Sequence, residues 1–270
     1  MTRPLPRSLI VVKLGGSALT DKERIYTARV KEIHRAAKQI ANLRKKFSLV
    51  IVHGAGSYGH IPVEQWRLAS GFKDRSQLRG LTLTKAKLLE WEMIFASVFL
   101  KNKVPLIPMV ASDFVIAQDG RISSADLSGI RNWLKLGCVP SIGGDIVTDL
   151  TAGFSVVSGD QLAAYLAVKL RAARLIFGTD VDGIFDANPK LDPHANMMRE
   201  LTASSARSAA TGASRSTVPD VTGGMGGKLI EAAAAASNGI PVCFINLTKS
   251  TRLAKAALGQ KVLSSRILPN

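Results

Sequence analysis

Short apolar runs recur along the chain and are separated by longer stretches in which apolar residues follow a helical period. The runs of strand length lie at 9–12, 49–52, 104–108, 139–142, 174–177 and 242–245. The stretches with helical character lie at about 27–46, 81–102, 158–171 and 225–238. Continuous apolar strands that alternate with helices are typical of a parallel sheet covered on both faces. The pattern predicts an α/β protein built on one open sheet.

One segment, 204–221, departs from this alternation because it is rich in Ser, Ala, Thr and Gly. We interpret it as a mobile connection with a short helix, and the sequence leaves open whether it closes over a ligand. No internal repeat is visible. We expect a single domain over 1–270, with an N-terminal lobe at about 1–178 and a C-terminal lobe at about 179–270.

The charge balance favours anionic partners. Lys and Arg number 36 against 20 Asp and Glu, which leaves a net charge of +16. Such a surplus suits nucleotides, phosphorylated metabolites, nucleic acids or anionic lipids without choosing among them. Aromatic residues make up only 6% of the chain, and no aromatic run is present for base stacking. A dedicated nucleic-acid binder is therefore the weaker alternative.

The apolar content does not predict a membrane protein. No window approaches the roughly 20 apolar residues of a membrane span. Cys138 and Cys243 stand alone in apolar runs, without metal-ligand spacing. Two isolated cysteines are typical of free thiols in a reducing compartment. We expect a cytoplasmic protein.

The first apolar run ends in a lysine and two glycines. The sequence there is Lys13-Leu14-Gly15-Gly16-Ser17, and Thr20 and Lys22 follow. Paired glycines let the backbone approach a ligand closely, and their N–H groups can face phosphate oxygens. A tight turn explains the glycines, but it does not explain a lysine at the end of a buried strand, where an unpaired charge is costly. We expect an anion-binding site here.

The second apolar run leads into a glycine-rich loop that ends in a histidine. Its sequence is His53-Gly54-Ala55-Gly56-Ser57-Tyr58-Gly59-His60. The spacing differs from the G-x-G-x-x-G dinucleotide fingerprint, so we expect the loop to open a helix whose N-terminus holds an anion. His60 falls in or near the first turn of that helix and can donate a hydrogen bond to a phosphate. A helix-surface histidine is the alternative, and His53 is interpreted as a structural residue.

Two later motifs also follow apolar runs. Gly143-Gly144-Asp145 comes directly after one run, and Ser158-Gly159-Asp160-Gln161 opens a predicted helix. Ser158 and Gln161 fit a capping box, and Asp160 in the first turn stabilises the helix dipole in any case. The functional alternative is that the Asp160 carboxylate holds the lysines of a phosphate site in place.

The C-terminal part carries two more candidate motifs. Asp180 and Asp182 follow a strand and suit either a metal or a turn, but they lack the twelve-residue pattern of a calcium loop. The run Gly223-Gly224-Met225-Gly226-Gly227-Lys228 precedes an alanine-rich helix and suits a nucleotide phosphate. It is not a Walker A loop, because Leu229 follows the lysine where Ser or Thr is required.

Taken together, these motifs resemble the amino acid kinase family from Lys13 through Lys228 and beyond. The ordered set is K-x-G-G-S, the glycine loop, G-G-D, S-G-D, T-D-V-D-G and T-G-G-M-x-x-K. Within the family, the loop at 53–60 resembles that of isopentenyl phosphate kinases, and fosfomycin kinases are similar but less so. The resemblance implies a three-layer αβα sandwich with an open, mainly parallel sheet. It also implies a homodimer that uses ATP and Mg²⁺ to convert isopentenyl phosphate to isopentenyl diphosphate in isoprenoid biosynthesis by an alternative mevalonate route.

The resemblance further implies a role for each motif. The residues that it assigns to ATP are Lys13, Gly15, Gly16, Ser17, Ala55, Asp180, Gly224 and Lys228. Those that it assigns to the acceptor are Gly54, Ala55, Gly56, Gly59, His60 and Gly159. Those that it assigns to catalysis are Lys13, Lys22, His60 and Asp160. Lys22 would stabilise the transferring phosphoryl group and Asp160 would orient the lysines, while no residue is assigned to a metal.

Two residues depart from the family pattern, and other functions stay open. Ala55 stands where many relatives have glycine and requires a negative φ. Tyr58 stands where phenylalanine is common, and its hydroxyl is expected to change little. We expect the acceptor tail to meet apolar side chains of 81–102 or Ile146, although core packing is the alternative for the candidates Met93, Ile94 and Phe95. Two alternative functions stay open. One is a kinase that acts on a phosphonate such as fosfomycin or on UMP, and the other is a non-catalytic protein that binds a nucleotide or an oxyanion.

Overall fold

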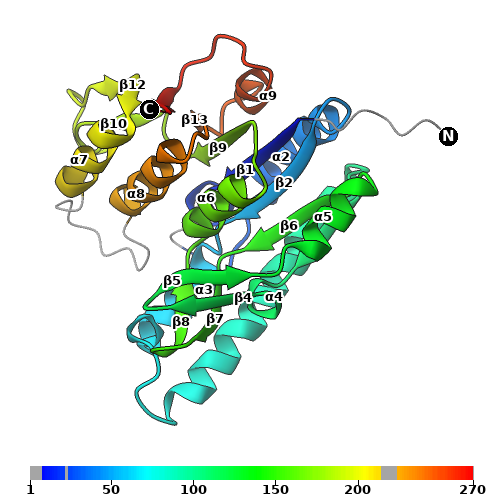
Figure 1. Ribbon diagram of the computed structural model, residues 1–270, viewed down its shortest axis with the longest axis vertical. Coiled ribbons are helices and arrows are strands. Elements are labelled where there is room, and N and C mark those ends of the chain that lie inside the picture. The colour runs from blue at the N-terminus through cyan, green and yellow to red at the C-terminus, as the bar shows by residue number, and fades with distance from the viewer. Residues whose placement is uncertain (1–7, 22–23, 214–223, 270) are drawn as a thin grey trace.

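The computed structural model describes residues 8–21, 24–213 and 224–269. A twisted eight-stranded sheet crosses the molecule in the order β12-β14-β13-β9-β1-β2-β6-β3 (Figure 1). Its strands are β12 (Glu200–Thr202), β14 (Ser265–Leu268), β13 (Val242–Asn246), β9 (Arg174–Thr179), β1 (Leu9–Leu14), β2 (Ser48–His53), β6 (Val139–Gly143) and β3 (Leu106–Met109). All neighbours in this sheet are parallel except β13 and β14. The sheet is therefore mainly parallel, as the apolar runs predicted.

Helices cover both faces of this sheet, so the predicted three-layer αβα sandwich is confirmed. Ile10 and Val12 of β1 pack on α2 (Val30–Leu43), α4 (Gln77–Lys101) and α9 (Arg252–Ala257). Val11 points to the opposite face, where the core includes residues of α5 (Ser128–Lys135), α6 (Gly159–Lys169), α7 (Ala203–Ala213) and α8 (Gly224–Ser237). Successive residues of a strand face opposite sides, so a strand between two helical layers must be apolar throughout.

The expectation of one open sheet is wrong, because the described residues form two further sheets. A four-stranded sheet has the order β5-β4-β7-β8, with β4 (Val115–Gln118), β5 (Arg121–Ala125), β7 (Asp145–Asp149) and β8 (Gly153–Val157). A two-stranded sheet joins β10 (Ile184–Phe185) to β11 (Met197–Met198). These strands are short and interrupted by polar residues: β4 alternates buried and exposed residues, β5 has no buried residue, and β7 begins and ends with an aspartate. They therefore lack the continuous apolar runs that revealed the main sheet.

The candidate motifs converge at the carboxyl edge of the main sheet. Leu14 of β1 lies level with His53 of β2 on one side and with Gly178 of β9 on the other, and His53 lies level with Gly143 of β6. Four strands thus end at the same level, and the loop after each one starts there. In open parallel sheets this edge is where ligands bind. Two short helices, α1 (Gly16–Leu19) and α3 (Ser57–Gln65), begin in the loops after β1 and β2. Helix α6 begins after β8, but its first residue lies against the end of β2, since a Cβ on Gly159 would lie 3.0 Å from the His53 carbonyl oxygen.

Other expectations have mixed outcomes. In segment 204–221 the described residues to 213 belong to helix α7, so the expected helix is confirmed, and residues 214–221 lie outside the described part of the chain. Cys138 and Cys243 are both free thiols. No described helix is long and apolar enough to cross a bilayer. The proposed lobe boundary near Gly178 stays a prediction.

Candidate active site

A buried cluster of two lysines and one aspartate lies at the carboxyl edge of the sheet. Lys13 Nζ, at the end of β1, lies 2.6 Å from Asp160 Oδ1 in the first turn of α6. Lys228 Nζ, from the first turns of α8, lies 3.1 Å from Asp160 Oδ2. The side chains of Lys13 and Asp160 are 5% and 4% exposed. Residues from three distant parts of the sequence therefore form one cluster that carries a net positive charge.

The protein stabilises the charged form of Asp160 in this buried position. Burial by itself raises the pKa of Asp160, but the charges and hydrogen bonds of Lys13 and Lys228 outweigh that effect and lower the pKa to about 2. Ser158 caps α6 by accepting a hydrogen bond from Gln161 N at 3.1 Å, so the predicted N-cap is confirmed. The reciprocal half of the capping box is wrong, because the Gln161 side chain instead accepts from Ile122 N and donates to Gly120 O.

The glycines of the first two loops allow those loops to touch. A Cβ placed on Gly16 would lie 2.6 Å from Gly56 N, and one on Gly54 would lie 2.6 Å from Gly16 N. Gly56 has φ +52°, and a Cβ there would lie 2.0 Å from Thr20 Oγ1. A side chain at any of these positions would push the loops apart. The backbone amides of the loops after β1 and β2 are thereby brought into one small region, which suits an anion with many oxygens.

The loop after β2 opens helix α3 as predicted. Gly56 is the N-cap, and His60 lies in the first turn, where its N–H bonds to Gly56 O at 3.0 Å. Ala55 does not have a positive φ, which agrees with the expectation for a non-glycine residue. Gly59 must lack a side chain because its Cβ would meet the Ala55 Cβ at 2.6 Å. The positive N-terminal end of α3 therefore faces the same edge as Lys13.

Ser57 is a candidate that the sequence reasoning missed. It is the first residue of α3, is 8% exposed, and its Oγ has no hydrogen-bond partner among the described residues. A buried hydroxyl without a partner costs free energy unless a ligand or water satisfies it. The sequence signal that could have identified Ser57 is its position in the glycine-rich loop, between Gly56 and Tyr58.

His53 is structural, as interpreted from the sequence, and its neighbours explain why. Trp91 Nε1–H can only donate, and it donates to His53 Nδ1 at 3.0 Å. His53 Nδ1 is therefore an acceptor, so Nε2 carries the proton and donates to Glu92 Oε2 at 2.6 Å. The His53 carbonyl accepts a hydrogen bond from Gly144 N at 3.1 Å, and a Cβ on Gly159 would lie 3.0 Å from this carbonyl oxygen. His53 thus ties α4, β6 and α6 to the end of β2.

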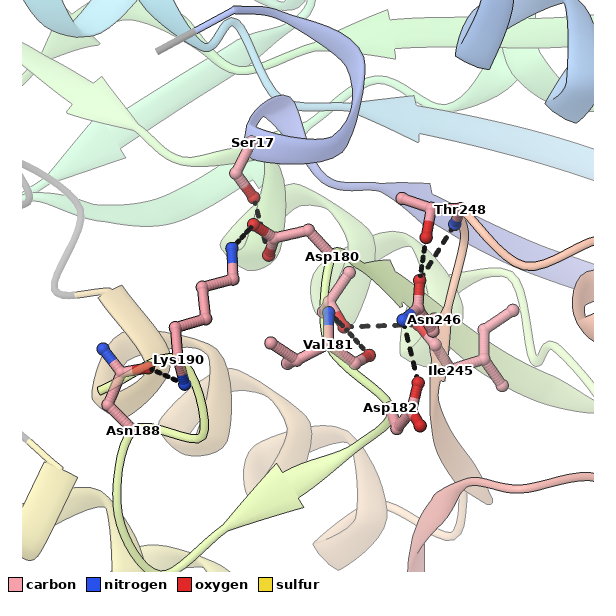
Figure 2. Close-up of polar contacts among 10 residues, drawn as sticks. Ser17, Asp180, Val181, Asp182, Asn188, Lys190, Ile245, Asn246 and Thr248 are labelled. Carbon is pink, nitrogen blue, oxygen red and sulfur yellow. Dashed lines mark hydrogen bonds and ion pairs between the residues drawn. The ribbon is translucent and has the colours of Figure 1, made fainter. Parts of the chain in front are cut away.

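The two aspartates after β9 point in different directions (Figure 2). Asp180 Oδ1 accepts from Ser17 Oγ at 3.3 Å, and its other oxygen pairs with Lys190. Asp182 Oδ1 instead accepts from Asn246 and Arg252, each at 2.8 Å. Asp180 therefore belongs to the edge that holds the first glycine turn, whereas Asp182 anchors β13 and α9. Among the described residues, no group of three His, Cys, Asp or Glu side chains could hold a metal ion.

A pocket opens beside the cluster, between α4 and the ends of β3 and β6. Its lining joins apolar side chains of Leu88, Leu89, Met109 and Val110 to the polar residues His53, Lys85, Glu92 and Asp145. Lys85 Nζ pairs with Asp145 at 2.6 Å. The space open to water is about 20 Å³, close to what one water molecule needs.

The residues expected at the acceptor tail do not line this pocket. Met93 is 74% exposed, Phe95 is fully buried in the core, and Ile146 packs in a separate cluster with Phe154. The place of the acceptor tail therefore stays a prediction, and Phe95 has the core-packing role that was its alternative. The helical phase of α4 places Leu88 and Leu89 at the pocket.

The structure brings most of the predicted residues to one edge of the sheet. Those gathered there are Lys13, Gly15, Gly16, Ser17, Gly54, Ala55, Gly56, Gly59, His60, Gly159, Asp160, Asp180, Gly224 and Lys228. Lys22 lies outside the described residues, so its predicted role stays a prediction. Lys190 is a further residue that the sequence reasoning missed, although it follows the Thr179-Asp180-Val181-Asp182-Gly183 motif by only a few positions.

This combination of a mainly parallel αβα sandwich and a lysine–aspartate–lysine cluster agrees with a family comparison. The sequence profile of the Amino acid kinase family matches residues 8–246. The chain belongs to this family.

Similar proteins within this family include isopentenyl phosphate kinases. The chain is 36% identical to the isopentenyl phosphate kinase of Methanothermobacter thermautotrophicus over 96% of this chain and 98% of that protein. It is 32% identical to the isopentenyl phosphate kinase of Methanocaldococcus jannaschii over 67% of this chain and 72% of that protein. A crystal structure of an isopentenyl phosphate kinase superposes with a TM-score of 0.83 at 34% identity, covering 96% of this chain and 99% of the other.

Proposed function

We propose that the protein is an isopentenyl phosphate kinase, which transfers the γ-phosphoryl group of ATP to isopentenyl phosphate and forms isopentenyl diphosphate. The observation that carries this assignment is the similarity to an isopentenyl phosphate kinase at 36% identity over 96% of the chain. The local geometry supports it, because a buried cationic cluster and the N-terminal end of α3 share one edge of the sheet.

The chemistry needs little more than positioning and charge neutralisation. Phosphoryl transfer passes through a transition state whose charge is spread over the phosphoryl oxygens. A phosphate acceptor is already a competent nucleophile, so no general base is required. The obstacle is repulsion between two anions, and fixed cations and amides reduce it without reorganising during the reaction. Lys13 and Lys228 supply the cations and Asp160 holds them in place.

We assign the acceptor side to the start of α3. Its backbone N–H groups and the His60 side chain would bind the acceptor phosphate, and the buried Ser57 hydroxyl would add a donor. Gly54, Gly56 and Gly59 allow the close approach that this requires. Gly159 places the first turn of α6, and with it Asp160, against the end of β2.

We assign the ATP side to the first glycine turn, the Asp180 region and α8. Two lysines beside closely packed glycine backbones are a donor set that fits a polyphosphate. The carboxylates of Asp160 and Asp180 already pair with lysines, so the residues would fit Mg²⁺ only as an ion held mainly by the phosphates of ATP. When bound, Mg²⁺ would neutralise charge on the transferring group.

We propose that the prenyl tail lies in the pocket between α4 and β6. Leu88, Leu89 and Met109 supply apolar contacts, and the pocket adjoins His53 and Gly144 next to the acceptor loop. Because the pocket now has room for about one water molecule, the leucine side chains must move to admit the tail.

We further propose that the protein acts as a cytoplasmic homodimer. Leu89, Met93 and Leu100 of α4 are 48%, 74% and 74% exposed and share one face of the helix by their spacing. An exposed apolar stripe of this kind is typical of a protein interface. The mass of the protein in solution, measured by mass photometry, tests the dimer.

An acceptor panel with ADP release as the readout tests the proposed function. Isopentenyl phosphate, fosfomycin and UMP are compared at equal concentration with ATP and Mg²⁺. We expect turnover that is highest with isopentenyl phosphate. Turnover only with UMP or fosfomycin would overturn the assignment in favour of another kinase of this family, and ATP binding without turnover would indicate a nucleotide-binding protein.

A further inference from the structure

The described residues between α1 and α2, which lie on either side of positions 22 and 23, pair with one another beside the acceptor loop, and we call residues 20–21 and 24–28 the α1–α2 turn. Thr20 and Ala28 form an antiparallel bridge, Asp21 N donates to Thr27 O at 2.8 Å, and Arg29 N donates to Leu19 O at 2.7 Å. Tyr26 within the turn has φ +51°. That conformation is uncommon for a bulky residue and persists only where neighbouring groups hold it.

Tyr58 of α3 supplies such a contact. Its hydroxyl donates to the Tyr26 carbonyl oxygen at 2.6 Å, and Tyr58 is 2% exposed. The ring of Tyr58 lies 5.6 Å from that of Tyr26 and stacks on Trp91 at 5.4 Å. Lys87 Nζ of α4 lies over the Tyr26 ring, 4.7 Å from its centre, and makes a cation–π contact with it. Both the backbone and the side chain of Tyr26 are therefore fixed by α3 and α4.

The base of the turn is tied to the same loop. Ser57 N donates to Thr20 Oγ1 at 3.3 Å, and Thr20 Oγ1 donates to Gly16 O at 3.0 Å. Ser57 and Tyr58, which are neighbours in α3, thus hold the turn at two points, Thr20 and Tyr26. Two hydrogen bonds thus join the α1–α2 turn to the acceptor loop, and a third joins Thr20 to the first glycine turn.

We propose that the Tyr58 hydroxyl is a positioning group for phosphoryl transfer, because it holds the Tyr26 side of the α1–α2 turn against the acceptor loop. The expectation that this hydroxyl changes little is thereby replaced by a specific role. Burial raises the pKa of Tyr58, so the hydroxyl stays protonated and remains a donor at neutral pH. The proposal rests on the proposed function, since it concerns the step that joins the two substrates.

Tyr58→Phe tests this role because it removes one oxygen atom and leaves the ring stacking in place. We expect kcat with isopentenyl phosphate to fall about fivefold, the factor that corresponds to one hydrogen bond of about 1 kcal/mol, with the KM for ATP within about twofold of wild type. Hydrogen exchange at the amides of Asp21 and Arg29 should quicken. Lys87→Met, which removes the cation over the Tyr26 ring without touching Tyr58, should change kcat in the same direction.

The matched control is Tyr165→Phe. Tyr165 lies on α6 and also has a lysine, Lys169, over its ring at 5.7 Å. It packs on the core at the opposite face of the main sheet from Tyr26 and Tyr58. The Tyr165→Phe variant should leave kcat unchanged. Full kcat in Tyr58→Phe, or equal losses in kcat and ATP affinity, would overturn the proposal. If the wild type prefers another acceptor, the proposed substrate fails, and the comparison of the variants is made with that acceptor, so the two conclusions are tested separately.

Discussion

Lys13 at the end of β1 and Asp160 at the start of α6 form a buried ion pair whose Nζ–Oδ1 distance is 2.6 Å. Lys228 approaches the other oxygen of the same carboxylate at 3.1 Å. One carboxylate thus fixes two ammonium groups that would otherwise repel each other in a place with little water. This relationship makes the cationic edge possible, because two lysines alone would lose their charge or turn outward.

Asp160→Asn should abolish most of the activity. The amide keeps the shape of the side chain but removes the negative charge that Lys13 and Lys228 share. We therefore expect kcat to fall at least about 100-fold, as on removal of other preorganised electrostatic groups. We also expect the free energy of unfolding to fall by about 3 kcal/mol. Steady-state kinetics and urea unfolding measure both effects. Asp182→Asn is the control, since Asp182 binds Arg252 and Asn246 away from the lysines, and a similar loss of kcat there would contradict the assignment.

The stabilising effect of Asp160 should depend on pH in a defined window. Its pKa is lowered to about 2 in the folded protein, whereas an unfolded aspartate has a pKa of about 3.9. A group with a depressed folded pKa stabilises fully above the unfolded value and loses this effect as the pH falls through the folded value. The difference in unfolding free energy between wild type and Asp160→Asn should therefore be constant above about pH 5 and shrink between pH 4 and 2. A difference that stays flat across this window would show that Asp160 is not the group responsible.

His60→Ala should raise the KM for isopentenyl phosphate more than it raises the KM for ATP. His60 lies in the first turn of α3, on the side that we assign to the acceptor phosphate. We expect about a tenfold loss in kcat/KM for the acceptor, which corresponds to a charge-assisted hydrogen bond of about 1.4 kcal/mol. His34→Ala on α2, where the ring contacts Asn102, serves as the control. Equal losses for both substrates would show that His60 is wrongly placed.

Gly54→Ala should impair activity because the new Cβ would lie 2.6 Å from Gly16 N. The backbone must shift, and the amides of the two loops then separate. We expect a loss of kcat/KM of about 100-fold, since small displacements in a positioned site are costly. Gly129→Ala in α5 is matched, because its Cβ would meet only Met109 Cε at 3.5 Å. That variant should keep full activity and gain up to about 1 kcal/mol in helix stability, and activity lost in both would exclude a local effect.

The main sheet and its helices could be read from the sequence because their burial on both sides requires continuous apolar runs. The strands at 9–12, 49–52 and 174–177 were all predicted and are extended by only one or two residues in β1, β2 and β9. The four-stranded sheet was missed, because its strands are short and polar residues interrupt them, so none contains a long apolar run. Their pairing depends on contacts between β4, β5, β7 and β8 that no single segment reveals.

The candidate site, like the fold, could be predicted from the sequence only in part. Residue type and strand end were enough to select Lys13, His60, Asp160 and Lys228, because a lysine ending a buried strand and glycines opening a helix are locally unusual. The pairing of Lys13 and Lys228 through one carboxylate required the fold, since these residues come from β1, α6 and α8. The hydroxyl of Tyr58 looked unimportant until the fold placed it at 2.6 Å from the Tyr26 carbonyl.

Local chemistry along the chain therefore determined the family, the class of fold and which loops carry anion-binding groups, because these depend on hydrophobic period and on residues at strand ends. Only the three-dimensional arrangement decided which lysines share one carboxylate, which glycines allow two backbones to touch and which side chains line the pocket. The physical reason is that these properties depend on distances between segments remote in sequence, and packing of the helices on the sheet sets those distances.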